Sequence, residues 1–303
     1  AEDTPLSALA LQMLAEAAGF PHGVMTVVTA KRAEAVAGVL TTHPDVRKIS
    51  FTGSTRVGKL LMQQCAGTVK KLSLELGGNS PFIVFDDADL DAAVAGAIIT
   101  KFRNAGQACV AANRIYVQSG VMAAFAARLK AAIAEMPVGP GLEAGTKIGP
   151  LINQAAVEKV DGLVKDAVEK GAYLALGGGL HERGGQYFAP TLLTGATQDM
   201  EIFSTEIFGP VAALYAFETE AEVIRLANDT PYGLAAYYWT RDIGRVFRVG
   251  EALEYGLLGA NEVLTSNPAT PFGGMKESGL GREGSKYGLE DFVEIKYLAL
   301  GGI

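Results

Sequence analysis

Apolar residues along the first 150 positions follow two alternating patterns, one with helical spacing and one in short continuous runs. Helical spacing predicts helices from Asp3-Thr4-Pro5 to Gly19, at Ala33–Leu40, at Thr55–Ala66, and from Asp86–Asp91 to Arg103. The short runs predict strands at Val24–Val28, Lys48–Phe51, Lys70–Leu74 and Pro81–Phe85. Because helices and strands alternate, we expect a parallel α/β sheet.

The second half of the chain continues this alternation. Strands are expected at Arg114–Val117, Tyr173–Leu176, Val211–Phe217, Leu234–Trp239, Leu257–Ala260 and Phe292–Leu300. Helices are expected at Ala123–Ile133, Gln154–Lys170, Val223–Ala227 and Gly244–Gly250. Thr219 and Glu222 have the spacing of a capping box at a helix start. Residues 271–288 are rich in glycine, and we expect them to form a surface loop.

Composition narrows the class of protein. The chain has 303 residues, of which 49% are hydrophobic, enough for a sizeable core. Its formal charge is −7, and it contains no basic run, so we expect no nucleic-acid partner. No apolar run reaches membrane-spanning length, and we expect no membrane partner. With only two cysteines and no signal-peptide pattern, we expect a cytoplasmic protein with free thiols.

The first candidate site is the turn Phe51-Thr52-Gly53-Ser54-Thr55, which follows a strand and opens a helix. Free N–H groups at a helix start can bind a phosphate, and Gly53 allows close approach of the ligand. A plain strand–helix turn is the alternative. The segment also partly matches a P-loop, but Leu60 replaces the hydroxyl residue that such a loop needs. We therefore do not expect an ATPase.

The second candidate is Glu75, in Leu74-Glu75-Leu76-Gly77-Gly78. It ends an apolar strand, and ligands of open parallel sheets bind at the carboxyl ends of strands. The two glycines would give this carboxylate freedom to move. A glutamate that has simply reached the surface at a strand end is the alternative.

The third candidate is Cys109, in a short polar loop after a predicted helix. With Arg103 and backbone dipoles nearby, we expect a partly exposed thiol with a lowered pKa. Cys65 lies within an amphipathic helix and is expected to be inert. The acidic run at 86–91 is expected to be a helix start rather than a cation site, and the three histidines lack zinc-ligand spacing. No metal site is therefore expected.

Together, these motifs resemble the aldehyde dehydrogenase family. The resemblance rests first on the two motifs around Gly53 and Glu75. It rests also on three more motifs: Gly106-Gln107-Ala108-Cys109, Glu206-Ile207-Phe208-Gly209-Pro210 and Pro271-Phe272-Gly273-Gly274-Met275-Lys276 with Ser278-Gly279. The distance along the chain from Glu75 to Cys109 is the one that the family uses. They occur in the family's order and extend over essentially the whole chain.

The resemblance implies an aldehyde-dehydrogenase-like α/β fold. Residues 1–76 would be the remaining part of a Rossmann-type cofactor domain, and residues 77–270 a catalytic α/β domain. Residues 271–303 would hold a return loop and an oligomerisation strand, which joins a neighbouring subunit in a dimer or tetramer.

The resemblance also implies roles for site residues. Cys109 would be the nucleophile, with its backbone N–H helping to stabilise the oxyanion, and Glu75 would activate the hydrolytic water. The cofactor, NADP or NAD, would be bound by five residues: Gly53, Ser54, Leu76, Glu206 and Phe208.

A narrower resemblance is to succinate-semialdehyde dehydrogenases, through Lys101–Gln107 and Gly279–Gly288. It implies that Arg103 binds the carboxylate of a small aldehyde substrate and that Ser266 assists. A guanidinium suits this task because it can donate two parallel hydrogen bonds to a carboxylate. Pro268 would reshape the substrate loop, so glutarate semialdehyde or another short carboxylated aldehyde is an alternative substrate.

The family's N-terminal portion, with part of its cofactor site and one oxyanion donor, has no counterpart in this sequence. Whether this chain is active without that portion is therefore open. A non-catalytic assembly module is the alternative, disfavoured by the intact Cys109, Glu75 and Glu206. Transfer of the acyl group to coenzyme A is a third reading, disfavoured by Glu75. Ala111 replaces the second cysteine of some relatives, so we expect no disulfide switch.

Overall fold

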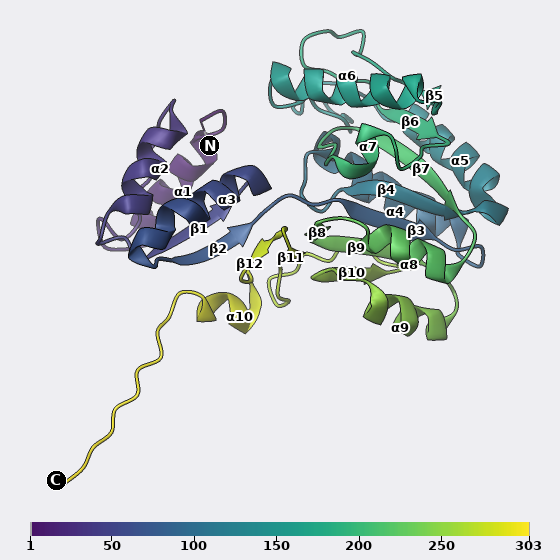
Figure 1. The fold of residues 1–303 in the computed structure, drawn as a ribbon. Coiled ribbons are helices and arrows are strands. Elements are labelled where there is room, and N and C mark those ends of the chain that lie inside the picture. Colours follow the sequence, from purple (N-terminus) through teal and green to yellow (C-terminus); the bar gives the residue numbers. More distant parts are fainter. Residues whose placement is uncertain (1, 303) are drawn as a thin grey trace. The chain divides into compact units, whose positions relative to one another are not determined.

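The computed structural model describes residues 2–302, which divide into two compact units (Figure 1). The first unit comprises the described residues up to Ile49 together with Lys59–Leu72. The second comprises Ser50–Gly58 and the residues from Ser73 onward, and it holds nearly all of the hydrophobic core. The domain boundaries expected from the resemblance, at residues 76 and 270, stay a prediction.

The second unit is built on a seven-stranded sheet of order β10-β9-β3-β4-β7-β6-β5. All of its pairings are parallel except that of β5 with β6, which confirms the predicted parallel α/β sheet. In this order the strands are Leu257–Ala260, Ala235–Trp239, Ser80–Val84, Ala112–Gln118, Val211–Phe217, Thr191–Thr194 and Tyr173–Leu176.

Helices pack on this sheet through their apolar faces. Helices α4 (Leu90–Phe102) and α5 (Ser119–Ala134) contact the central strands. The others in this unit are α6 (Gln154–Glu169), α7 (Glu201–Ser204), α8 (Glu220–Asn228), α9 (Ile243–Ala252) and α10 (Ser285–Glu290).

Two helix starts show why these segments are helical. The Asp89 carboxylate accepts hydrogen bonds from the N–H groups of Asp91 and Ala92, so the acidic run does begin α4. The Thr219 hydroxyl accepts from the N–H of Glu222, as its spacing predicted for α8.

The remaining helices and strands are short or lie nearer the start of the chain. They are α1 (Leu6–Ala17), α2 (Ala33–Thr42), β1 (Lys48–Thr52), α3 (Thr55–Cys65) and β2 (Lys71–Glu75), with two-residue strands β8 (Tyr232–Gly233), β11 (Met275–Lys276) and β12 (Gly279–Leu280). Strands β1, β2 and β12 form a three-stranded sheet, in which Gly279 pairs with Glu75. No helix within residues 2–302 is long and apolar enough to cross a membrane.

Two strand predictions are wrong for the isolated chain. Residues 24–28 form no strand, and the Val27 N–H donates to the Gln12 side chain instead of to a neighbouring strand. Residues 292–300 also form no strand, and Ile295 is 98% exposed. An apolar run becomes a strand only when a second strand satisfies its backbone groups. The pairing with a neighbouring subunit stays a prediction.

The glycine-rich segment 271–288 is more ordered than expected, because it contains β11, β12 and the start of α10. Its glycines serve close contacts. A side chain at Gly279, whose φ is +142°, would collide with the backbone of Leu74 in β2. Strand β6 and helix α7, each of four residues, were not predicted.

Candidate active site

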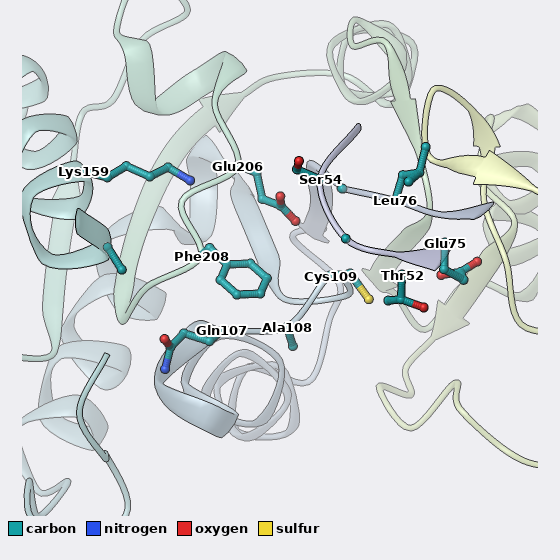
Figure 2. Close-up of a pocket in the computed structure, with 13 residues that line it drawn as sticks. Thr52, Ser54, Glu75, Leu76, Gln107, Ala108, Cys109, Lys159, Glu206 and Phe208 are labelled. Carbon is teal, nitrogen blue, oxygen red and sulfur yellow. The ribbon is translucent and has the colours of Figure 1, made fainter. Parts of the chain in front are cut away.

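A cavity of about 570 Å³ lies within the second unit (Figure 2). Its walls come from the turn after β1, the end of β2, the loop of residues 103–111 before β4, helix α6 and the segment after α7. The loop 103–111 carries Cys109, the predicted nucleophile, and is called the nucleophile loop below. It brings together seven predicted residues: Gly53, Ser54, Glu75, Leu76, Cys109, Glu206 and Phe208. Segments far apart in the sequence thus meet at one place.

The nucleophile loop owes its shape to an unusual backbone turn. Asn104 and Ala105 have φ values of 55°, and Gly106 has a φ of 75°. Left-handed backbone costs about 1–2 kcal/mol for a residue other than glycine, so such a turn needs support from its surroundings. Gln107 gives part of it, because its amide accepts from the N–H of Ile152 and donates to the carbonyl of Pro150. The loop presents Cys109 to the cavity (Figure 2).

The Cys109 thiol is half-buried, and its pKa is raised to about 11. Burial is the largest cause, and the carboxylates of Glu75 and Glu206 add to it. The N–H groups of Cys109 and Val110 act in the opposite direction. The expectation of a lowered thiol pKa is therefore wrong, because folding buries the sulfur and the charged groups it meets there are carboxylates.

Glu75 is a buried carboxylate at the end of β2. Burial raises its pKa to about 7, the nearby Glu283 adds to this rise, and Arg282 and the N–H of Gly274 oppose it. Its Oε2 atom has no hydrogen-bond partner among the described residues. Glu75 thus combines a pKa near neutrality with a buried oxygen whose hydrogen-bonding capacity is not used.

The two glycines after Glu75 allow close packing, and the expected movement of Glu75 stays a prediction. A Cβ atom on Gly78 would lie 2.5 Å from the carbonyl oxygen of Cys109, and one on Gly77 would lie 2.9 Å from Oε2 of Glu206. The absence of side chains here lets the segment that carries Glu75 contact both the nucleophile loop and Glu206.

Glu206 occupies another part of the cavity wall and has cationic neighbours. Its Oε1 accepts a hydrogen bond of 3.1 Å from the N–H of Gly78. Burial raises the pKa of Glu206, while this hydrogen bond and the ammonium groups of Lys159 and Lys101 oppose the rise. Figure 2 shows the Lys159 side chain extending toward Glu206.

Lys159 was not predicted as a site residue, although the sequence holds a signal for it. It lies on α6 three positions after Ala156 and four before Leu163, which both face inward. A lysine at that spacing lies at the edge of the helix's buried face, which is formed by Val157, Val160, Leu163, Val164 and Ala167. Thr52, Gln107 and Ala108 also line the cavity and were not predicted as binding residues.

The turn around Gly53 has the predicted local geometry. The Gly53 N–H donates to the Glu75 carbonyl oxygen at 2.9 Å, which fixes the turn beside β2. Ser54 directly precedes the first turn of α3. Phe208 lines the same cavity with a φ of 52°.

Arg103 and Ser266 are exposed, and neither is among the described residues that line this cavity. The hydroxyl of Tyr237 links their surroundings. It donates to the carbonyl of Val110 at 2.9 Å, hydrogen-bonds to the Thr265 side chain and lies within the electrostatic influence of Arg103. The proposed substrate groups therefore belong to a region next to the nucleophile loop.

The fold and the site together define an α/β protein with a cysteine and two carboxylates at one cavity. Residues 1–298 match the model of the Aldehyde dehydrogenase family, and the chain belongs to that family.

Several relatives agree with this assignment. The chain is 59% identical to a 3-sulfolactaldehyde dehydrogenase of Pseudomonas putida, over 100% of this chain and 62% of the relative. It is 58% identical to a succinate-semialdehyde dehydrogenase (NADP(+)) of Escherichia coli strain K12, over 99% and 62%. The crystal structure of a succinate-semialdehyde dehydrogenase from Burkholderia pseudomallei matches with a TM-score of 0.97 and 59% identity, covering 98% of this chain and 62% of that one. This confirms the predicted fold, and the chain spans about 62% of the length of these proteins.

Proposed function

We propose that the chain is the catalytic part of an NAD(P)-dependent dehydrogenase that oxidises a short aldehyde carrying an acid group. The observation that carries this proposal is the single cavity shared by Cys109, Glu75 and Glu206. Succinate semialdehyde is the first candidate substrate. It shares an aldehyde and an anionic group with glutarate semialdehyde and with 3-sulfolactaldehyde, the substrate in the name of the Pseudomonas putida relative.

The residues around the cavity fit a nicotinamide dinucleotide. Glu206 and Lys159 offer an acceptor and a donor suited to ribose hydroxyls, and the turn at Gly53 and Ser54 opens a helix whose first N–H groups suit a phosphate. Leu76 and Phe208 supply apolar contact. When bound, the nicotinamide supplies the acceptor for the hydride removed from the aldehyde carbon. We propose NADP or NAD as the cofactor.

Cys109 acts as the nucleophile in this mechanism. Because the pKa of its thiol is about 11, a base must take the proton before sulfur attacks the aldehyde carbon. Glu75, whose pKa is about 7, is the base at this cavity. The new C–S bond leaves negative charge on the former carbonyl oxygen, and the N–H of Cys109 stabilises it. Loss of hydride from that carbon leaves a thioester on Cys109.

Glu75 also acts in the second half of the reaction. Once the proton taken from Cys109 has passed to solvent, the Glu75 carboxylate takes a proton from water, which attacks the thioester carbon. The C–S bond breaks, the carboxylic acid product leaves, and sulfur regains a proton. The unpartnered Oε2 atom of Glu75 is the proposed acceptor for that water.

Arg103 and Ser266 are the proposed partners of the substrate's acid group. Arg103 lies six positions before Cys109 and is exposed, so its guanidinium is open to an anion. The hydrogen bonds of Tyr237 to Val110 and Thr265 support a common location for the nucleophile loop and the loop that holds Ser266.

The assembly is a further part of the proposal. The run 292–300 exposes large apolar side chains, including Tyr297 at 89% and Leu300 at 72%. We propose that it pairs with a neighbouring subunit of a homodimer or homotetramer in the cytoplasm. Light scattering on the chain and on a variant that ends at residue 291 would test this, and an unchanged oligomeric mass would contradict it.

The decisive experiment measures reduced-cofactor formation from succinate semialdehyde, glutarate semialdehyde and a neutral aldehyde, with NAD and NADP in turn. It should use the chain alone and the chain supplemented with the further sequence that its relatives contain. Cys109→Ala should abolish turnover, and Cys65→Ala should preserve it. Retained turnover in Cys109→Ala would contradict the nucleophile, and absence of both turnover and nicotinamide binding in every form would favour an assembly module.

The substrate class has its own test. Arg103→Ala should raise KM for succinate semialdehyde by roughly tenfold or more, because a charged hydrogen-bonded pair is lost. The KM for a neutral aldehyde should change little. Equal effects on both aldehydes would contradict the carboxylate role of Arg103.

A further inference from the structure

The segment after α7 carries two residues of the cavity wall, Glu206 and Phe208, yet it belongs to no helix or strand. Its backbone groups therefore lack the partners that regular structure supplies, although Ile207 is fully buried. Phe208 also has a left-handed φ of 52°. Such strain persists only where neighbouring groups hold the chain in place.

One side chain holds the backbone on both sides of Glu206. The amide nitrogen of Asn113 donates to the Thr205 carbonyl oxygen at 2.9 Å, and its amide oxygen accepts from the N–H of Ile207 at 2.8 Å. Asn113 is 3% exposed and lies on β4, four positions after Cys109. It thus ties the segment of Glu206 to the strand that follows the nucleophile.

A second asparagine orients the first. The amide oxygen of Asn79 accepts from the amide nitrogen of Asn113 at 2.7 Å, and the amide nitrogen of Asn79 donates to the Phe203 carbonyl oxygen at 3.0 Å. Asn79 directly follows Gly78, whose N–H donates to the Glu206 carboxylate. The backbone and the carboxylate of Glu206 are therefore held from the same neighbouring strands.

We propose that Asn113, oriented by Asn79, is a positioning residue that fixes the Glu206 carboxylate, and with it Phe208, at the cavity. The amide is suited to this because it presents one donor and one acceptor to the two peptide groups that flank Glu206. This inference rests on the proposed function in one respect: that the positioned Glu206 carboxylate binds a nicotinamide cofactor. The two hydrogen bonds of Asn113 to residues 205 and 207, called the clamp below, can be tested without turnover.

The chain contains a matched control. The Asn228 amide makes the same pair of bonds around Leu253, donating to the Ala252 carbonyl oxygen at 2.9 Å and accepting from the Glu254 N–H at 3.0 Å. Asn228 is not among the residues that line the cavity. Loss of this second clamp should alter the protein locally without reaching Glu206.

The test measures the pH dependence of Cys109 alkylation by iodoacetamide, followed on the Cys109 peptide by mass spectrometry. Because the Glu206 carboxylate disfavours the Cys109 thiolate, Glu206→Gln should speed alkylation at pH 7 by roughly threefold or more. Asn113→Ala should shift the profile in the same direction, and Asn228→Ala should leave it unchanged. In the Glu206→Gln background, Asn113→Ala should add nothing.

Two results would overturn the proposal: a folded Asn113→Ala protein with the wild-type profile, or a shift that persists in the Glu206→Gln background. If Asn113→Ala does not unfold cooperatively, Asn79→Ala replaces it with the same expected results. In the active protein, Asn113→Ala should raise the cofactor KM about tenfold with little change in kcat. If no form oxidises an aldehyde, the proposed function fails, and the alkylation profiles still decide the clamp.

Discussion

The cavity has two carboxylates in contrasting surroundings. Glu75 is fully buried, one of its oxygens lacks a partner, and the nearby Glu283 helps raise its pKa to about 7. Glu206 is half-buried, accepts a hydrogen bond from Gly78 and has the ammonium groups of Lys159 and Lys101 as neighbours. The Glu75 carboxylate is therefore suited to exchange a proton near neutral pH, whereas the neighbours of the Glu206 carboxylate oppose the rise in pKa that its burial causes.

The largest effect is expected at Glu75, the carboxylate suited to proton exchange. Glu75→Gln should lower steady-state turnover by about 10²- to 10⁴-fold, because water loses its base. At high pH, where Cys109 is deprotonated without a base, the first half of the reaction should still proceed in Glu75→Gln. Rapid-mixing absorbance should then show a burst of reduced cofactor before blocked thioester hydrolysis stops turnover. Unchanged steady-state turnover in Glu75→Gln would contradict the assignment of Glu75 as the base.

The second-largest effect is expected at Glu206, the carboxylate with cationic neighbours. Glu206→Gln should raise the cofactor KM by roughly 10- to 100-fold, since hydrogen bonds to a charged group contribute about 1.5–3 kcal/mol. Initial-rate kinetics with varied cofactor provides the measurement. Glu201→Gln, a change at an exposed glutamate of α7, is the matched control and should have no effect. A loss confined to kcat would assign Glu206 to proton transfer instead.

A third prediction concerns Gly78, which lies three positions after Glu75 and donates a hydrogen bond to the Glu206 carboxylate. Gly78→Ala would place its Cβ 2.5 Å from the Cys109 carbonyl oxygen and should lower the free energy of unfolding by about 1–3 kcal/mol. Gly162→Ala, on α6 with nothing within 4 Å, should raise it by about 0.5–1 kcal/mol. Urea unfolding would measure both. Equal responses would show that Gly78 is not closely packed.

The smallest expected effect is a change in pH dependence. Hydrolysis needs deprotonated Glu75, so turnover limited by that step should rise with pH through about 7. Because the Glu283 carboxylate raises the pKa of Glu75, Glu283→Gln should move the midpoint to lower pH. Arg282→Gln should move it to higher pH, since the guanidinium favours the charged form. Shifts in one direction for both variants would contradict this electrostatic account.

The sequence predicted the parts of this molecule that are encoded locally. The central strands appear as apolar runs, and the capping residues Asp89 and Thr219 mark the helix starts that the structure shows. Glu75 could be selected because it ends a strand shortly before two glycines, and Cys109 because it lies in a short loop after a helix. Their roles in catalysis remain proposals.

What the sequence could not reveal depends on partners distant along the chain. The pKa of Cys109 rises because folding buries the thiol and brings Glu75 and Glu206 to it, and neither glutamate is near it in sequence. The clamp formed by Asn113 depends on residues 205 and 207 in the same way. Residues 24–28 have the composition of a strand, but strand formation requires a neighbour that local sequence does not specify.

The raised pKa of Cys109 has a further consequence, for durability under oxidative stress. With a pKa of about 11, the thiol is ionised at pH 7 far less than an ordinary cysteine. Peroxides attack the thiolate, so the Cys109 thiol of the resting protein should be oxidised slowly to sulfenic and sulfinic acids. Position 111 is an alanine, and the only other cysteine, Cys65, is buried in α3. Protection of the sulfur thus depends on keeping it protonated between turnovers rather than on a reversible disulfide.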